Sequence, residues 1–290
     1  RFNPDRAHFS LEEIASFNDK KTYQLLSEGN TTAVFQMESR GARDLCKRLK
    51  PTVFEDIIAM MALNRPGPLG SGMVDDFIVR SKEQRQTGKA NPSWYFHPDL
   101  EPVLRSTYGV MVYQEQVMLV AQILAGYSLG SADLLRRAMG KKKKEEMDAQ
   151  REKFTKGAIG RGVDAQLATQ LFDLMAKFAD YGFNKSHSAA YAVLGYQTAW
   201  LKCHYPAEYM SATLSSDMDA TDKVQIFYAD TLAQKVHVLA PDINASEYRF
   251  VPVPDEHYAQ NKPTRTIRYG LGAIKGTGQS AVEAIVAERK

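Results

Sequence analysis

Cysteine is scarce in this chain, since Cys46 and Cys203 are the only two among 290 residues and neither belongs to a C-x-x-C pair. Two isolated thiols exclude a disulfide framework and a zinc ribbon. No apolar run approaches the roughly 20 residues that a membrane-spanning helix needs, and the N-terminus lacks the pattern of a signal peptide. The chain is therefore expected in the reducing cytoplasm, with no membrane partner.

Signatures of catalysis and cofactor binding are also missing. Gly88-Lys89-Ala90 lacks the upstream Gly and the following Ser or Thr of a phosphate-binding P-loop. The glycine-rich segment 270–278 has three residues where a dinucleotide fingerprint needs two. The six histidines show no metal-ligand spacing. We predict no catalytic residue, no metal ligand and no bound cofactor in this chain.

What the chain does have is the composition of an ordinary soluble protein, with 44% hydrophobic residues, 24% charged residues and a formal charge of +3. A length of 290 residues suggests one large domain or two. The chain begins without Met and ends in an unterminated helical pattern over residues 280–290, which predicts a piece of a longer protein.

Helical periodicity dominates residues 31–218. Thr52 and Glu55 have capping-box spacing before a helix that should run to about Leu63. Residues 73–79 predict a short helix in an irregular stretch, and residues 132–139 predict a helix that Gly140 ends. Other helices are expected around 117–124, 167–178, 188–204 and 206–218, whereas residues 109–113 resemble a strand.

The predicted secondary structure changes after residue 218. A helix at 222–234 precedes strand candidates at 236–239, 249–253 and 266–271. The predicted fold class is therefore mainly α, with a helical domain followed by a small α+β domain.

The strongest charge feature runs from Arg136 to Arg161, which holds ten Lys or Arg against four Asp or Glu. Its net charge of +6 is twice that of the whole chain and attracts polyphosphate or nucleic acid. The forks of adjacent Arg136 and Arg137 suit paired contacts to phosphate oxygens. The alternative is a solvated helix face with Glu and Lys pairs.

A second candidate is the polar loop that opens a helix at residues 182–191. Backbone amides at a helix start favour an anion, and Tyr191 lies one helical turn past His187, where its ring can meet a base. The alternative is helix capping by Ser186 or Ser188, with His187 on the surface. In segment 270–278, the glycines either form a tight turn or allow backbone amides to approach a DNA phosphate.

Five segments carry a family resemblance: 32–39 (TAVFQMES), 65–69 (RPGPL), 108–116 (YGVMVYQEQ), 135–142 (LRRAMGKK) and 181–188 (YGFNKSHS). In this order they resemble the bacterial C-family replicative DNA polymerases, the DNA polymerase III alpha subunits. The resemblance covers about residues 20–290, and Gly270 to Gly276 resembles the segment just before the family's helix-hairpin-helix region.

The resemblance implies the fingers part of such a polymerase. Residues 1–30 would be a polar connector from the palm side, 31–218 the helical fingers domain, and 219–290 a little-finger α+β subdomain truncated in a C-terminal helix. The implied activity is template-directed nucleotidyl transfer on primer-template DNA with an incoming dNTP. Family members hold Mg²⁺ on palm aspartates that this chain lacks, so we expect the fragment alone to be inactive. Other replisome subunits are implied partners, through regions mostly outside this chain.

The resemblance also assigns residues. Arg136 and Arg137 match the pair expected to hold the triphosphate. Nucleotide contacts are implied for Lys185, Ser186, His187 and Tyr191, and DNA contacts are predicted for Lys141, Lys142 and Lys275. Two alternatives stay open: the fingers of a translesion paralogue in the same family, and a non-catalytic nucleic-acid-binding or protein-interaction module that carries this domain.

Overall fold

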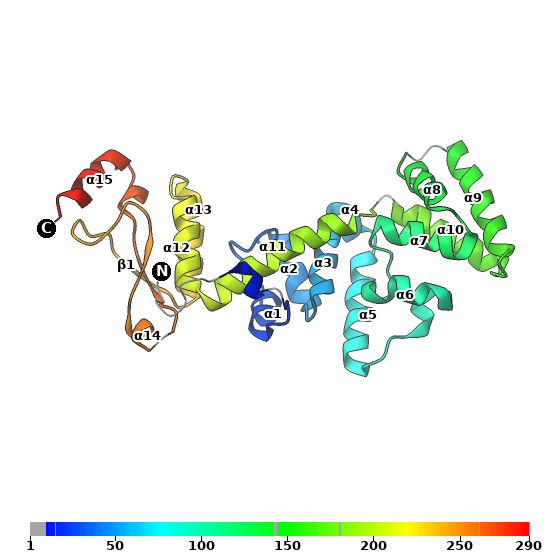
Figure 1. The fold of residues 1–290 in the computed structure, drawn as a ribbon, viewed down its shortest axis with the longest axis horizontal. Helices are drawn as coiled ribbons and strands as arrows, with labels where there is room; N and C mark the ends of the chain where they lie inside the picture. The colour runs from blue at the N-terminus through cyan, green and yellow to red at the C-terminus, as the bar shows by residue number, and fades with distance from the viewer. Residues whose placement is uncertain (1–9, 15, 142–143, 180, 261, 290) are drawn as a thin grey trace. The chain divides into compact units, whose positions relative to one another are not determined.

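A computed structural model describes residues 10–14, 16–141, 144–179, 181–260 and 262–289 of the chain (Figure 1). The chain forms two compact units. The continuous unit is Arg40–Val193, and the discontinuous unit combines Arg1–Ser39 with Leu194–Lys290. This division follows packing and runs through a helix, whereas the boundaries predicted at residues 30 and 218 follow composition and resemblance; those boundaries stay a prediction.

Helices build the continuous unit. Its elements are α2 (Arg40–Leu49), α3 (Phe54–Leu63), α4 (Pro66–Gly70), α5 (Met73–Thr87), η3 (Pro92–Tyr95), η4 (Pro98–Leu100), α6 (Glu101–Leu104), η5 (Arg105–Thr107), α7 (Gln114–Ala125), α8 (Leu129–Lys141), α9 (Lys144–Ile159), α10 (Ala165–Ala179) and the first part of α11 (Lys185–His204).

The main core of this unit lies between α7, α8, α9 and α10, which cluster together in Figure 1. Val120, Leu135, Phe154 and Phe172 are all completely buried there. Gly157 of α9 permits the close packing on α7, because a Cβ at this position would lie 2.3 Å from the carbonyl oxygen of Ala125. These contacts fix α8, which carries the two predicted arginines, against α7.

Two helix predictions differ from the structure at their starts or ends. Helix α3 is capped by Asp56, whose carboxylate accepts hydrogen bonds from the amides of Thr52 and Val53 at 2.9 and 3.4 Å, so the capping carboxylate predicted at Glu55 lies one residue later. Helix α5 extends eight residues past the predicted end at Val79, because the first left-handed glycine after its start is Gly88, with φ of 69°.

Two further predictions were wrong in the same region. Helix α8 continues through Gly140 to Lys141, since a glycine inside a helix weakens it but does not end it without a left-handed turn. Residues 109–113 form no strand; the segment is buried, starts in a turn at Gly109 with φ of 77°, and has a single bridge from Tyr113 to Phe183. Helix α9 was not predicted at all, because its sequence is dominated by charge.

The discontinuous unit mixes helices with a small sheet. Its elements are η2 (Leu11–Ile14), α1 (Lys20–Ser27), the rest of α11, α12 (Pro206–Ser216), α13 (Thr221–Ala233), β1 (His237–Leu239), β2 (Val251–Val253), α14 (Glu256–Ala259), β3 (Thr266–Arg268), η6 (Leu271–Ala273) and α15 (Gln279–Ala287). The strand order is β1-β3-β2, with β1 parallel and β2 antiparallel to β3. Helices α12 and α13 pack on this sheet (Figure 1).

A buried lysine joins the two sequence segments of this unit. The Nζ atom of Lys202 donates to the carbonyl oxygens of Asn30 and Thr32 at 2.9 and 2.8 Å and lies 2.7 Å from a carboxylate oxygen of Asp230. These contacts hold the segment 31–37, whose residues form turns. Ala33 and Gln36 have left-handed φ values of 63° and 59° there, so the turn is held in a conformation that these residue types seldom adopt.

The predicted fold class is confirmed: the chain is mainly α-helical, with one small three-stranded sheet near its C-terminal end. Among the residues that the structure describes, no helix has the length and apolar character needed to cross a membrane.

Candidate nucleotide and nucleic-acid interface

Arg136 and Arg137 share one carboxylate on helix α8. Nε and Nη2 of Arg136 donate to Oδ1 of Asp133 at 3.0 and 2.8 Å, and Nε of Arg137 lies 2.8 Å from Oδ2. The hydrogen bond from Arg136 lowers the pKa of Asp133, and the charges of both arginines act in the same direction. Asp133 therefore stays ionised and orients both guanidinium groups.

Arg137 is the more open of the two, since 62% of its side chain is exposed against 31% for Arg136. Its two terminal amino groups have no hydrogen bond or ion pair with any described residue. One nitrogen of the fork is thus anchored, and the other two face solvent, where they can receive an anion.

Gln114 connects Arg136 to the loop before α11. Its Oε1 accepts from Nη1 of Arg136 at 3.4 Å, and its Nε2 donates to the carbonyl oxygen of Gly182 at 3.1 Å. Backbone hydrogen bonds join the same two segments, from the Gln114 amide to the Phe183 carbonyl and from the Phe183 amide to the Val112 carbonyl. The structure therefore brings the two regions predicted as separate candidates into one site.

The start of α11 already holds an anion from the chain itself. Glu115 accepts hydrogen bonds from the side-chain amide of Asn184 at 2.9 Å and from the backbone amide of Lys185 at 3.1 Å. Oδ1 of Asn184 in turn caps the amide of His187 at 2.8 Å. The cap is therefore Asn184, not Ser186 or Ser188, and Glu115 takes the place that the prediction gave to a ligand phosphate.

Aromatic side chains line the exposed face of the first turns of α11. The rings of His187 and Tyr191 lie 4.2 Å apart at 31°, and Phe183 meets His187 edge to face at 5.3 Å. Lys185, Ser186 and His187 are exposed, and Tyr191 is half-buried. The guanidinium of Arg65 lies 4.4 Å above the ring of Phe183. These residues present aromatic ring faces and hydrogen-bond donors on one surface.

Arg65 holds the loop before α11 in place. Its guanidinium donates to the carbonyl oxygens of Ala62 and Tyr181 at 2.8 and 2.6 Å, and burial lowers its pKa. An Arg that binds two carbonyls and stacks on a ring immobilises the segment it contacts.

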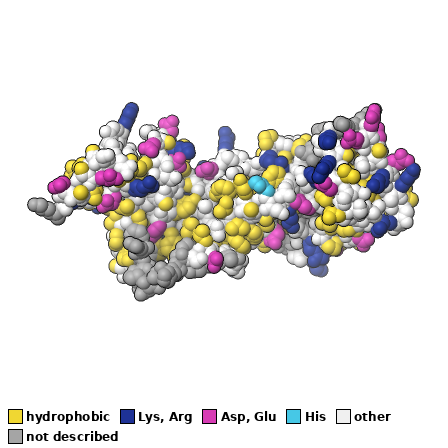
Figure 2. Space-filling model, turned by 45° about the horizontal axis from the view of Figure 1, so that its top comes forward, with side chains coloured by type: hydrophobic (Ala, Val, Ile, Leu, Met, Phe, Trp, Pro, Cys, Tyr) yellow, Lys and Arg dark blue, Asp and Glu magenta, His cyan; other side chains and the backbone are white. Residues whose placement is uncertain are grey.

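Much of the basic charge between Arg136 and Arg161 is neutralised locally. Arg151 pairs with Asp173 at 2.5 Å, and Lys156 pairs with Glu152 at 2.5 Å. Figure 2 shows basic and acidic side chains intermingled over the α8 to α10 end of the unit. Lys141 is exposed at the end of α8, whereas Lys142 lies outside the described residues. For α9, the structure therefore agrees with the alternative interpretation, a solvated helix face with salt bridges.

Lys275 belongs to the discontinuous unit. It is exposed in the turn between η6 and α15, next to Gly276 with φ of 89°. A Cβ on Gly276 or Gly278 would meet nothing within 4 Å, whereas one on Gly272 would strike the ring of Tyr248 at 2.5 Å. One side of the turn therefore packs against Tyr248, and the other side leaves the backbone at Gly276 and Gly278 accessible.

Four residues of this site were missed by sequence reasoning in these roles: Arg65, Gln114, Glu115 and Asp133. Three of them stand inside the segments that carry the family resemblance, so their position was available as a signal. Asp133 contacts Arg136 and Arg137 at helical spacing, which the sequence does contain. Arg65, Gln114 and Glu115 contact residues of the loop before α11, up to 116 residues away, which spacing along the chain does not reveal.

The helical unit and its arginine-bearing site define a class of protein, the polymerase fingers. Residues 3–162 match the model of the bacterial DNA polymerase III alpha subunit finger domain, and the chain belongs to this family. It is 55% identical to the DNA polymerase III subunit alpha of Pasteurella multocida, and 53% identical to those of Pseudomonas aeruginosa and Escherichia coli. These matches cover 94, 98 and 94% of this chain.

The chain spans about a quarter of the length of these relatives, at 23, 24 and 23%. A helix-hairpin-helix model matches residues 235–290. The segment Gly270 to Gly276 therefore lies within the matched helix-hairpin-helix range and not before it, which corrects the placement made from the sequence.

Proposed function

We propose that this chain binds the incoming dNTP and the primer-template DNA for template-directed nucleotidyl transfer in a bacterial replicative polymerase. The observation that carries the proposal is the link through Gln114, which joins the arginine pair of α8 to the first turn of α11. Phosphate-binding and base-contacting groups thereby stand on one rigid unit.

The arginine pair would hold the triphosphate. Asp133 restricts both side chains before the nucleotide arrives, so little rotamer freedom is lost when their free N–H groups meet phosphate oxygens. Charge-assisted hydrogen bonds of this kind are stronger than neutral ones.

The start of α11 would line the nascent base pair. Lys185, Ser186 and His187 present exposed donors, and the ring pair of His187 and Tyr191 presents a stacking face. Since Glu115 occupies the amide of Lys185, these contacts come from side chains and not from the end of the helix.

DNA contact is proposed for Lys141 at the end of α8, for Lys142, and for Lys275 in the second unit. The match to a helix-hairpin-helix model over 235–290 supports Lys275, because its turn bares backbone at Gly276 and Gly278 beside an exposed ammonium group.

Catalysis itself is proposed to need Mg²⁺ bound outside this chain. Mg²⁺ prefers oxygen ligands, and the group of three metal-ligand side chains among the described residues, Asp19, Cys203 and His204, offers only one carboxylate. That group does not fit Mg²⁺. We propose that the chain alone is inactive, and that it acts in the cytoplasm together with other replisome subunits.

The test is Arg136→Ala in the full-length polymerase. Loss of charge-assisted hydrogen bonds should raise the apparent KM for dNTP by about 10- to 200-fold. Arg151→Ala is the matched control, because Arg151 lies in the same basic segment and is also paired with an aspartate, but it stands on α9 outside the proposed nucleotide site. An unchanged KM in Arg136→Ala would remove this residue from the nucleotide site.

A further inference from the structure

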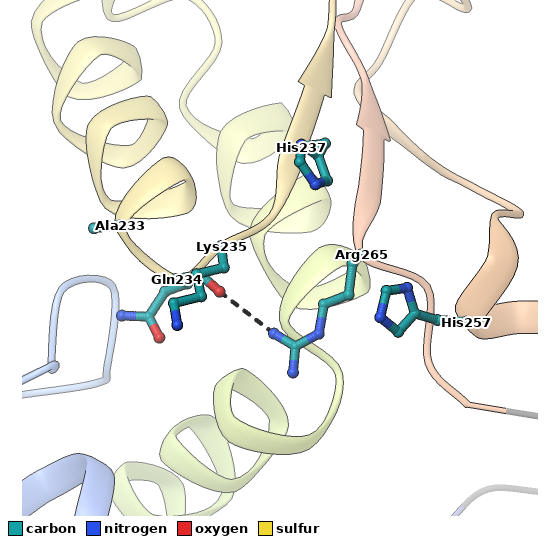
Figure 3. Close-up of a pocket in the computed structure, with 6 residues that line it drawn as sticks. All are labelled: Ala233, Gln234, Lys235, His237, His257 and Arg265. Atoms are coloured by element: carbon teal, nitrogen blue, oxygen red, sulfur yellow. Dashed lines mark hydrogen bonds between the residues drawn. The ribbon is translucent and has the colours of Figure 1, made fainter.

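A basic pocket lies in the discontinuous unit where α13 ends and β1 begins. Its volume is about 580 Å³ and its lining residues are Ala233, Gln234, Lys235, His237, His257 and Arg265 (Figure 3). Four of the six carry basic side chains and none carries an acid. They come from the end of α13, from β1, from α14 and from the residue before β3.

The basic side chains of this pocket have few partners of their own. The guanidinium of Arg265 makes one long hydrogen bond, from Nη1 to the Gln234 carbonyl oxygen at 3.4 Å. Lys235 and His237 are exposed, and their side chains have no hydrogen bond or ion pair with a described residue. Nδ1 of His257 is buried and has no hydrogen-bond partner. Oδ1 of Asp255 lies 3.7 Å from this atom, which is beyond hydrogen-bonding distance.

The backbone that presents these groups is firmly held. Asp255 accepts hydrogen bonds from the Arg265 amide at 2.7 Å and from the His257 amide at 3.0 Å. The His237 amide donates to the Arg265 carbonyl at 2.7 Å, beside the paired strands β1 and β3. Figure 3 shows the ring of His257 beside the Arg265 side chain. The pocket is therefore preorganised.

Two acids stand near these cations without entering the pocket. Both carboxylate oxygens of Asp255 accept hydrogen bonds from backbone amides. Its Oδ1 also lies 3.7 Å from Nδ1 of His257. Glu208 lies close enough to Arg265 to interact with its charge, and burial raises the pKa of Glu208. Neither acid lines the pocket, so a ligand in the pocket would meet Lys235 and Arg265 directly.

We propose that this pocket binds one nucleotide, with its phosphate on Arg265 and Lys235 and its base or sugar against the imidazole of His257. Guanidinium and ammonium groups together are the usual partners of phosphate. A volume of about 580 Å³ lies in the range of small-ligand sites and exceeds what a lone phosphate needs. The nucleotide can be free or a unit of single-stranded DNA. This site lies outside the residues used in the proposed function.

The experiment is histidine modification by diethyl pyrocarbonate, read by mass spectrometry on the 290-residue chain, with two probes. One probe is free dTMP and the other is single-stranded oligothymidylate. Both should protect His257 in a saturable manner below about 10 mM nucleotide. His97, in the other unit, is the internal control and should keep its reactivity.

Variants decide whether the pocket causes the protection. Arg265→Gln should raise the half-protecting concentration by about 10-fold or more, and Lys235→Met by a smaller factor. Lys262→Gln is the matched control, since Lys262 is an exposed neighbour that does not line the pocket. Lys235 is exposed, so its variant tests the site even where Arg265→Gln alters the fold.

The two probes separate the sources. Protection by the oligonucleotide at lower nucleotide concentration than by dTMP would identify DNA as the ligand, and the reverse would identify a free nucleotide. Absence of saturable protection by either probe, or protection that is indifferent to both variants, would overturn the site. Neither result bears on Arg136, whose test measures the KM for dNTP.

Discussion

Lys202 carries a buried charge, with its side chain completely shielded from solvent. Its ammonium group replaces water with two carbonyl oxygens and one carboxylate. A buried ion pair adds little net stability compared with an apolar pair, but removal of one partner leaves the other charged and unsolvated.

Lys202→Met should therefore lower the free energy of unfolding by about 3–5 kcal/mol. The double variant Lys202→Met with Asp230→Leu should recover part of that loss, because no charge is then left buried. Urea unfolding measures the stability of both variants, provided that the dependence of the unfolding free energy on urea concentration stays the same. A single variant with the stability of wild type would show that the carbonyl contacts and the ion pair are dispensable.

Asp255 gives a pH dependence of known sign. Burial alone would raise the pKa of its carboxyl, but hydrogen bonds from the Arg265 amide, the Thr266 hydroxyl and the Tyr258 amide lower the pKa to about 2. A folded-state pKa below the ordinary value near 3.9 means that the ionised group stabilises the fold above about pH 4. This contribution is lost as the pH falls through about 2.

Wild type should accordingly be more stable than Asp255→Asn at neutral pH, by about 1.5–3 kcal/mol for hydrogen bonds to a charged group. The difference should shrink between about pH 4 and pH 2 as the carboxyl becomes protonated. Chemical unfolding of both proteins across this range checks the prediction, and a difference independent of pH would contradict it.

At the scale of elements, two glycines in neighbouring helices have opposite roles. A Cβ on Gly157 of α9 would lie 2.3 Å from the carbonyl oxygen of Ala125, whereas one on Gly140 of α8 would meet nothing within 4 Å. Helix packing requires the first glycine and tolerates the second.

Gly157→Ala should destabilise the chain by about 1–3 kcal/mol through forced separation of α7 and α9. Gly140→Ala should stabilise it by up to about 1 kcal/mol, since alanine restricts the unfolded chain and favours a helix. Thermal or urea unfolding of this matched pair measures both signs. Equal effects of the two substitutions would show that the contact at Ala125 relaxes freely.

The elements also show how far sequence reasoning reaches. Apolar periodicity found the ends of α7, α10 and α13 to within three residues, and Pro206 marked the start of α12, because these signals are local. Residues 109–113 were misjudged as a strand: their apolar run is explained by burial, with Met111 in the core of the continuous unit. The single bridge joins Tyr113 to Phe183, which lies 70 residues further on. Arg136 was found as a charge, but its partner Gln114 was not, since only folding brings them together.

The whole molecule consists of one unit interrupted by another. The continuous unit Arg40–Val193 has its own core, formed by residues such as Leu124, Phe154 and Phe172. The discontinuous unit needs residues from both ends of the chain, as the bonds from Lys202 to Asn30 and Thr32 show.

Residues 40–193 expressed alone should therefore keep their helical circular dichroism and unfold in one cooperative transition. Residues 194–290 alone should be less stable than in the whole chain, because Lys202 and Asp230 would then lack the carbonyl partners of the first segment. Addition of residues 1–39 as a separate peptide should restore part of that stability. A continuous unit that unfolds without a cooperative transition would contradict this view.

The interrupted order has a consequence for synthesis on the ribosome. The turn at residues 31–37 leaves the ribosome long before Lys202, since 170 residues separate Thr32 from Lys202. Translation at roughly 5–20 residues per second makes the turn wait about 8–34 seconds for its partner. During that interval the carbonyl oxygens of Asn30 and Thr32 lack the ammonium group that binds them in the folded chain. The left-handed turn at Ala33 and Gln36 is therefore fixed only after the whole continuous unit has been synthesised.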